Sequence, residues 1–342
     1  MATASSRRAP AGAPACPKAM TFGPCGGVRD DGGCEVGPGP CTFLPLPTVR
    51  WPGASRPRTG PEPHLLALMR QRPVVVADLP AVALDRDSLE RAADRVVGHV
   101  DAVLLGDHGA ARVQFSPTYR ASLVQARGLP VWQGLNCWDR NRVALEGELA
   151  GLADLGVGAV HCVTGDHTAT GDRPDAQPVF DLDSTQLAAA ARAAGVLVSV
   201  GETPHGPPAE RRPHRLVEKV RAGADVCFVN HAGSVEALRS FVERATDAGA
   251  DVPFVACVAV ALDPGSADQL RRFTSLRLPA GHLAGIESAR DPRRAGIAAA
   301  IALAESYLSV PGVRGVDLSG VPTPGAELTT ATALAEIGRA LT

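Results

Sequence analysis

Aromatic residues are scarce in this chain of 342 residues, where phenylalanine, tryptophan and tyrosine together make up 4% of the sequence. So few flat rings provide no stacking platform of the kind that single-stranded nucleic acids bind. The formal net charge is only −2, so the chain also lacks the basic excess that attracts a phosphate backbone or an acidic membrane surface. We therefore expect no nucleic acid or membrane partner, and the composition favours small molecules or other proteins.

Long hydrophobic runs are also missing, because no stretch of 18 apolar residues occurs anywhere. The first fifteen residues carry two arginines and many small residues but lack the continuous apolar stretch of a signal peptide. We expect residues 1–15 to form a disordered tail and the protein to be cytoplasmic. In that reducing compartment, the eight cysteines are expected to be thiols or metal ligands rather than disulfides.

Four of the cysteines lie in a glycine- and proline-rich stretch that has almost no side chains able to build a core. Cys16, Cys25, Cys34 and Cys41 are separated by eight, eight and six residues, which is looser than the paired spacing of a zinc finger. A segment without a core needs a staple in order to fold. The sequence therefore predicts that residues 16–41 bind zinc or an iron–sulfur cluster, with four unrelated thiols as the alternative.

Beyond residue 73, short valine-rich runs alternate with alanine-rich segments of helical spacing. The eight runs occupy residues 74–78, 101–107, 130–136, 159–166, 196–202, 225–231, 253–260 and 313–320. Apolar strands that alternate with amphipathic helices indicate a parallel sheet covered on both faces. Eight such units predict an α/β fold, a (β/α)₈ TIM barrel over residues 73–342, although an open doubly wound sheet stays possible. An extra helix is expected before the eighth strand, and the proline-rich residues 42–72 are expected to be a tether.

A TIM barrel has its active site at the carboxyl ends of the strands, so the polar residues that close each apolar run are site candidates. They are Asp78, Asp107, His108, Asn136, Thr164, Asp166, Glu202, Asn230, His231 and Ser319. Carboxylates and amides around one mouth suit a polar heterocycle that needs hydrogen bonds and proton delivery. The competing interpretation is that some of them only cap the following helix. Two further patterns have structural explanations: His161 is expected to be a packed core histidine, and the basic run at residues 211–215 a solvated helix face.

Several motifs together are specific enough to suggest a family. They are "VTGDHTATGDRPDAQPVFDLDSTQL" (163–187), "NCWDRNRVALEGELAGLADLGV" (136–157), "VDAVLLGDHGAARVQFSP" (100–117), "LVEKVRAGADVCFVN" (216–230) and "PGVRGVDLSG" (311–320). With these motifs the barrel resembles the methylenetetrahydrofolate reductase family. The cysteine-rich segment resembles the domain that accompanies acetogen-type members of that family.

The resemblance implies roles for individual residues. Asp166 matches the aspartate that lies beside flavin and folate, Asp78 stands where the family has an acidic Glu, and Asn230 stands where a Gln holds the pterin. These three are the expected catalytic residues. The residues expected to bind cofactor are Asp107, His108, Asn136, Arg140, Asn141, Thr164, Gly165, His167, Phe180, Asp181, Asp183, Gln186 and Lys219.

The resemblance further implies reduction of methylenetetrahydrofolate to methyltetrahydrofolate. The expected ligands are a tetrahydrofolate derivative and FAD, or another flavin or deazaflavin, and an electron-donor protein and a homo-oligomer are expected as partners. In this reaction the five-membered ring opens to an iminium cation, which a carboxylate stabilises while an acid protonates the departing nitrogen. Two alternatives remain: a folate-dependent one-carbon transfer enzyme without hydride transfer, and a folate-binding accessory subunit.

Overall fold

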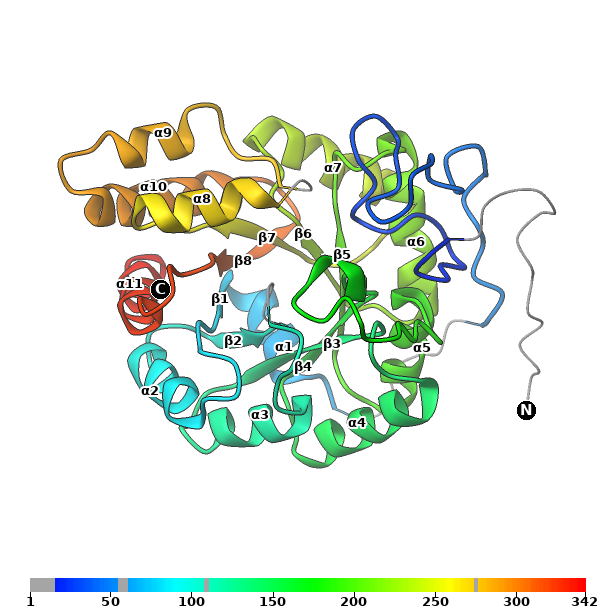
Figure 1. Cartoon of the computed structure of the whole chain (residues 1–342), viewed down its shortest axis with the longest axis horizontal. Coiled ribbons are helices and arrows are strands. Elements are labelled where there is room, and N and C mark those ends of the chain that lie inside the picture. The colour runs from blue at the N-terminus through cyan, green and yellow to red at the C-terminus, as the bar shows by residue number, and fades with distance from the viewer. Residues whose placement is uncertain (1–15, 55–60, 108–110, 274–275) are drawn as a thin grey trace.

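Eight parallel strands close into a barrel in the computed structural model, which describes residues 16–54, 61–107, 111–273 and 276–342. The strands are β1 Val74–Asp78, β2 Ala102–Leu105, β3 Val131–Asn136, β4 Ala159–Val163, β5 Val198–Glu202, β6 Val226–Val229, β7 Phe254–Ala259 and β8 Val313–Ser319. Pairing of β1 with β8 closes the ring, and the helices surround it (Figure 1). The predicted (β/α)₈ TIM barrel is confirmed.

The helices follow the strands in alternation. They are α2 Arg86–Val96, α3 Pro117–Gln125, α4 Arg142–Asp154, α5 Ser184–Ala193, α6 Arg212–Ala222, α7 Val235–Asp247, α8 Pro264–Arg272, α9 His282–Glu287, α10 Pro292–Leu308 and α11 Glu327–Leu341. Side-chain caps fix several starting points, such as Asp85 for α2 and Ser234 for α7. Between β7 and β8 the structure has α8, α9 and α10 where the sequence predicts one extra helix.

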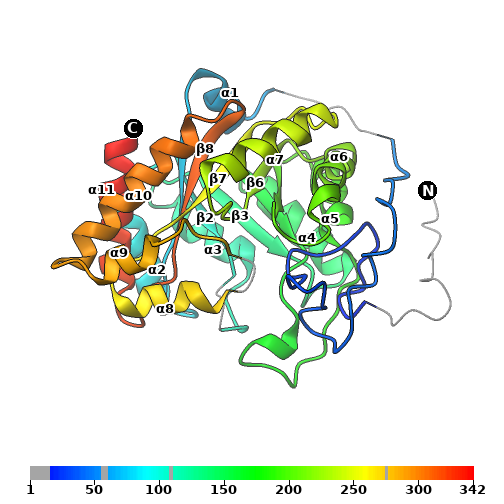
Figure 2. The same ribbon diagram turned by 90° about the horizontal axis from the view of Figure 1, so that it is seen from above.

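A short helix, α1 His64–Gln71, closes the amino end of the barrel. Its side chains Leu65 and Met69 are buried among the residues that fill the barrel interior, and Arg314 on β8 donates to the Met69 carbonyl over 2.6 Å. Figure 2 shows α1 at the end of the barrel away from the loops that follow β4. Residues 42–72 are therefore not irregular throughout, since the last part of the predicted tether is a helix packed into the core.

Residues 16–51, which we call the N-terminal segment, pack against the barrel beside α6 (Figure 1). Arg212 donates to the Cys25 carbonyl over 2.9 Å and Arg215 donates to the Phe22 carbonyl. Both arginines are buried, with Arg212 only 2% exposed. The prediction of a solvated face at residues 211–215 is therefore wrong. The N-terminal segment has little regular structure of its own, and these side chains donate hydrogen bonds to its backbone carbonyls.

Two carboxylates add to this attachment. The Asp183 carboxylate accepts the backbone N–H groups of Thr21 (3.0 Å) and Phe22 (2.9 Å), and the Glu218 carboxylate accepts the N–H of Trp51 (2.7 Å). The Trp51 ring lies 5.0 Å from that of Phe22 between centroids. The segment is thus fixed to α5 and α6 by both donors and acceptors. Among the described residues, no helix is long and apolar enough to cross a membrane.

Candidate functional site

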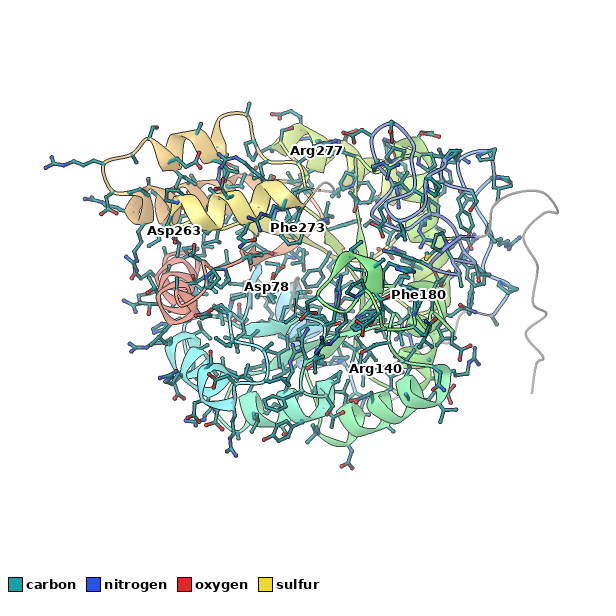
Figure 3. The ribbon with its side chains drawn as sticks, viewed as in Figure 1. Asp78, Arg140, Phe180, Asp263, Phe273 and Arg277 are labelled. Atoms are coloured by element: carbon teal, nitrogen blue, oxygen red, sulfur yellow. The ribbon has the colours of Figure 1, made fainter. Side chains whose placement is uncertain are left out.

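A cavity of about 420 Å³ opens at the carboxyl ends of the strands, where the sequence predicts the site. The predicted residues that line it are Asp78, Asp107, Asn136, Thr164, Gly165, Asp166, Glu202, Lys219, Asn230 and Ser319, whereas His231 is buried and does not line it. His108 lies outside the described residues. Figure 3 shows Asp78 near the centre of the barrel, whereas Arg140 and Phe180 lie to one side, toward α4 and α5.

Two aspartates from neighbouring strands meet in the cavity. Asp78 ends β1 and Asp317 lies on β8, and both line the cavity wall. Burial raises the pKa of Asp78 to about 6 against a hydrogen bond from Ser319. Burial and the Asp78 charge raise the pKa of Asp317 well above its ordinary value. Because two close carboxylates cannot both ionise readily, the pair holds a proton at neutral pH.

The cavity wall near β5 carries a compact group of charges. Glu202 lies 2.6 Å from the Lys219 ammonium and 3.6 Å from both Arg212 and Arg215. Burial opposes ionisation of Glu202, but Lys219 and the two arginines outweigh it and lower the pKa of Glu202 below its ordinary value. The carboxylate is therefore charged, and Lys219, expected to bind cofactor, is paired with the protein's own anion.

The loop after β4 brings Asp166 to the rim. Its side chain is 58% exposed and lies 3.7 Å from the Arg112 guanidinium, which stacks 5.5 Å from the centroid of the Trp138 ring. Gly165 has φ +84°, and a Cβ there would lie 2.9 Å from Trp138 and 3.0 Å from Asn136. Only glycine fits this close turn, which is the local reason that the TGD sequence can present Asp166 to the opening.

Asn136 at the end of β3 is occupied by protein partners. Its amide donates to the Asp107 carboxylate, and its carbonyl oxygen accepts the backbone N–H of Trp138 over 3.0 Å. Asp107 in turn lies 3.7 Å from the Arg120 guanidinium. Thr164 likewise accepts the Ser184 N–H over 3.1 Å. These side chains shape the wall, whereas two other groups that line it, Trp138 Nε1 and Asp317 Oδ1, have no hydrogen-bond partner among the described residues.

The N-terminal segment forms part of the same cavity. Lys18, Cys25 and Glu35 line it together with Gly26 and Gly27. Lys18 is ion-paired with Glu35 and donates to the Gly165 carbonyl over 2.8 Å. Burial raises the pKa of the Cys25 thiol to about 11, so this sulfur is a neutral thiol at pH 7. A segment expected to stand apart from the barrel thus belongs to the wall of its central cavity.

The remaining predicted cofactor residues lie away from the cavity lining. Asn141 caps α4, and Asp183 with Gln186 forms the capping box of α5. Asp181 accepts the Arg142 N–H over 2.8 Å, and Arg140 pairs with Asp139 at 2.7 Å. His167 accepts the Ala169 N–H and stacks on the buried Phe180 ring, 5.8 Å away. For these residues the capping and packing interpretation describes what their side chains do.

A flavin dinucleotide does not fit the residues that the resemblance assigns to it. Seven of them, Arg140, Asn141, His167, Phe180, Asp181, Asp183 and Gln186, lie outside the cavity lining. Asp183, at the start of α5, is occupied by the N-terminal segment. The cavity of about 420 Å³ falls in the lower part of the range for small-molecule sites, and its free polar groups suit a compact heterocycle better than an extended dinucleotide.

The four cysteines of the N-terminal segment are free thiols. Cys16 and Cys34 lie close enough to Cys41 to raise its pKa, behind the larger effect of burial, whereas Cys25 faces the cavity beside Lys18. Across the described ranges, no three His, Cys, Asp or Glu side chains come together as metal ligands. As placed, the four sulfurs do not fit a metal ion, and binding would have to draw Cys25 toward the others.

Sequence reasoning missed several charged residues of the cavity, namely Lys18, Glu35, Arg112, Arg212, Arg215 and Asp317. Asp317 was detectable, because inward residues alternate along a strand and Ser319, two positions later, is a candidate. The others come from loops, a helix and the N-terminal segment, where no local pattern marks a cavity residue. His161 is half-buried, hydrogen-bonds Ser199 over 2.8 Å and lines the cavity; desolvation lowers its pKa to about 3.

A closed barrel with ionisable side chains from several strands around one opening defines a TIM-barrel protein with a polar cavity at the strand ends. Within that class, the sequence model of the methylenetetrahydrofolate reductase family matches residues 86–319. The chain belongs to this family. The match does not reach β1 with Asp78 or the N-terminal segment.

Comparison with solved structures gives distant relatives of the fold. One is described as an uncharacterized protein from Clostridium thermocellum that binds two copies of 5-methyl-5,6,7,8-tetrahydrofolic acid, and it has 12% identity and a TM-score of 0.55, covering 79% of this chain and 96% of its own. Another is 2,3-dimethylmalate lyase of the PEP mutase/isocitrate lyase superfamily, with 15% identity and a TM-score of 0.46, covering 80% and 83%. No curated protein matches the sequence.

Proposed function

We propose that this chain binds a reduced folate in the barrel-mouth cavity and reduces methylenetetrahydrofolate to methyltetrahydrofolate. The observation that carries the proposal is the buried carboxyl pair Asp78 and Asp317 on the cavity wall, both with raised pKa values. Opening of the methylene bridge needs an acid that still holds its proton near neutral pH, and such a pair provides one. Family membership over residues 86–319 supports the same chemistry.

The other cavity residues suit the remaining parts of the reaction. The exposed Asp166 carboxylate at the rim would stabilise the iminium cation as it forms. The amide of Asn230, the indole N–H of Trp138 and Asp317 Oδ1 offer both donors and acceptors to a pterin edge. Since the residues for a flavin dinucleotide are engaged elsewhere, we infer that the reducing equivalents come from a separate electron-donor protein.

A second candidate is folate-dependent one-carbon transfer without hydride transfer, or folate binding as an accessory subunit. The observation that favours it is the engagement of Asp183, Gln186 and Asn141 in helix caps, which makes these side chains unavailable to hold a flavin. The acid pair and Asp166 would serve transfer equally well, since an iminium cation forms in both reactions.

Isothermal titration with 5-methyltetrahydrofolate tests binding, and the anaerobic absorption spectrum of the purified protein tests for flavin. Oxidation of methyltetrahydrofolate with an artificial electron acceptor then separates reductase from transferase. Turnover that requires the acceptor supports the reductase. Consumption of methylenetetrahydrofolate with an amine and no reductant supports transfer, and binding without either reaction supports the accessory subunit.

Metal binding by Cys16, Cys25, Cys34 and Cys41 stays a prediction, for zinc or an iron–sulfur cluster. Supporting it are the glycine-rich spacing and the proximity of Cys16, Cys34 and Cys41. Metal analysis of protein purified without oxygen should find about one zinc ion or one cluster per chain. Cys25→Ser should lower that content, and wild-type protein free of zinc and iron would end the prediction.

A further inference from the structure

Lys18 is a cation of the N-terminal segment that reaches the cavity of the barrel. The residue is only 4% exposed, yet it lines the cavity beside the loop that carries Asp166. Lysine is rarely buried to this extent unless its ammonium group is paired. The partners of Lys18 therefore indicate the role of its charge in the cavity.

Those partners belong to two different parts of the fold. Glu35, in the N-terminal segment, forms an ion pair with the ammonium, and the Gly165 carbonyl, in the loop after β4, accepts a hydrogen bond over 2.8 Å. The Asp166 charge acts on Lys18 as well. A charged donor is thus fixed to the peptide that immediately precedes Asp166, and charge-assisted hydrogen bonds of this kind are stronger than neutral ones.

The attachment of the segment holds Lys18 in this position. Asp183 accepts two backbone N–H groups at Thr21 and Phe22, and Arg212 donates to the Cys25 carbonyl. At Gly27 a Cβ would lie 1.3 Å from the Glu35 carboxylate. The absence of a side chain at Gly27 therefore lets the Glu35 carboxylate lie against this residue. These contacts all follow Lys18 closely in the chain, and they fix the part of the segment that carries it against α5 and α6.

We propose that Lys18 is a positioning residue of the folate cavity, which orients Asp166 toward the ligand by fixing the Gly165 carbonyl. The N-terminal segment is accordingly a working part of the ligand site, besides any role of its cysteines. This inference rests on the proposed function, because it takes a reduced folate as the ligand that Asp166 faces. It assigns a role to a residue outside the region that matches the family.

The test measures the dissociation constant of 5-methyltetrahydrofolate for full-length wild type and variants. Lys18→Met should weaken binding about 10- to 100-fold, the range for loss of a hydrogen bond from a charged group. Lys18→Arg, which keeps the charge, should remain within about threefold of wild type. The matched control is Arg211→Gln: Arg211 donates to the Leu44 and Leu46 carbonyls of the segment but does not line the cavity, so binding should be unchanged.

Hydrogen–deuterium exchange of residues 16–51 reports whether each variant keeps the segment attached. Wild-type affinity in Lys18→Met overturns the inference. Equal weakening in Lys18→Met and Arg211→Gln, with faster exchange in both, also overturns it, since Lys18 would then only hold the segment. If Lys18→Met does not fold, Glu35→Gln replaces it and should weaken binding severalfold. A wild-type protein that binds no folate overturns the proposed function and this inference with it, whereas intact wild-type binding isolates the failure to Lys18.

Discussion

Asp78 and Asp317 line the same cavity, but only Asp78 could be predicted as a site residue from the sequence. Asp78 closes a run of four apolar residues, so it is predicted as a strand-end group. Asp317 lies within β8, between Val316 and Leu318, which are fully buried, and looks like a strand interior position. Its function depends on the neighbouring strand, because β1 pairs with β8 and places the two carboxylates on one cavity wall. Pairing between distant strands is not visible in a local pattern.

The acid pair makes the stability of the protein depend on pH in a predictable direction. The pKa of Asp78 is raised to about 6 in the folded protein from an ordinary value of 3.8. A raised carboxyl pKa means that ionisation disfavours the folded state, so its contribution to stability falls as pH rises from 4 through 6. The difference in free energy of unfolding between Asp78→Asn and wild type should therefore shift in favour of the variant by roughly 1–3 kcal/mol from pH 4 to pH 8. Urea denaturation of both proteins at both pH values measures this shift.

The same substitution removes the proposed acid, so turnover should fall by at least about 100-fold while the fold stays intact. In the wild type, turnover should decrease as the pair loses its proton at higher pH. A constant difference in stability between Asp78→Asn and wild type from pH 4 to pH 8 would contradict the assignment of the raised pKa.

Asp166 belongs to the chemistry more than to the fold, because its side chain is largely exposed. Asp166→Asn should keep the melting temperature yet abolish turnover, because an amide cannot stabilise a cation as a carboxylate does. The control is Asp175→Asn on the same loop, an exposed residue outside the cavity lining. A near-normal rate in Asp166→Asn would remove this residue from the mechanism.

At the scale of elements, the barrel was the predictable part and the tether was not. Each of the eight strands falls within its predicted run, since buried parallel strands are continuous apolar sequences. The helix α1 was missed because proline surrounds it: Pro61 and Pro63 precede it and Pro73 follows. Its two buried side chains, Leu65 and Met69, are spaced by one helical turn, a signal too short to distinguish from chance.

The helix α1 should contribute to stability through the barrel interior. Leu65 is 1% exposed and packs with Val74 and Trp132 in the inner core. Leu65→Ala should lower the free energy of unfolding by about 2–5 kcal/mol, the cost of a buried leucine plus its cavity. Urea denaturation measures the effect, and folate affinity should stay unchanged because α1 lies away from the mouth. A loss below about 0.5 kcal/mol would mean that α1 does not close the barrel.

The first turn of α6 should contribute to stability by holding the N-terminal segment. Arg212 donates to Gly206, Pro207 and Cys25 carbonyls over 2.8–2.9 Å and is buried. Arg212→Met should lower the free energy of unfolding by about 3–5 kcal/mol, because carbonyls and the Glu202 carboxylate lose a buried partner. Arg244→Gln is the control, since the exposed Arg244 also donates to a nearby carbonyl, at Glu210, and should change stability by less than about 0.5 kcal/mol.

At the scale of the whole molecule, the segment and the barrel form one unit. The segment buries Met20, Phe22, Val28 and Phe43, which are too few apolar residues for a core of its own. Side chains of α6 donate hydrogen bonds to its backbone carbonyls. We expect residues 16–51 and the barrel strands to lose protection from hydrogen exchange at the same urea concentration. Loss of protection in the segment at a clearly lower concentration would instead show two units that unfold separately.

The attachment of Cys25 to Arg212 joins positions 187 residues apart in the chain. A ribosome that adds roughly 5–20 residues per second needs about 10–40 s to make that stretch. The cysteine-rich segment therefore leaves the ribosome well before α6 exists to receive it. During that interval its four thiols are accessible to a metal or a chaperone, and α6 then fixes the segment in whatever state the thiols have reached.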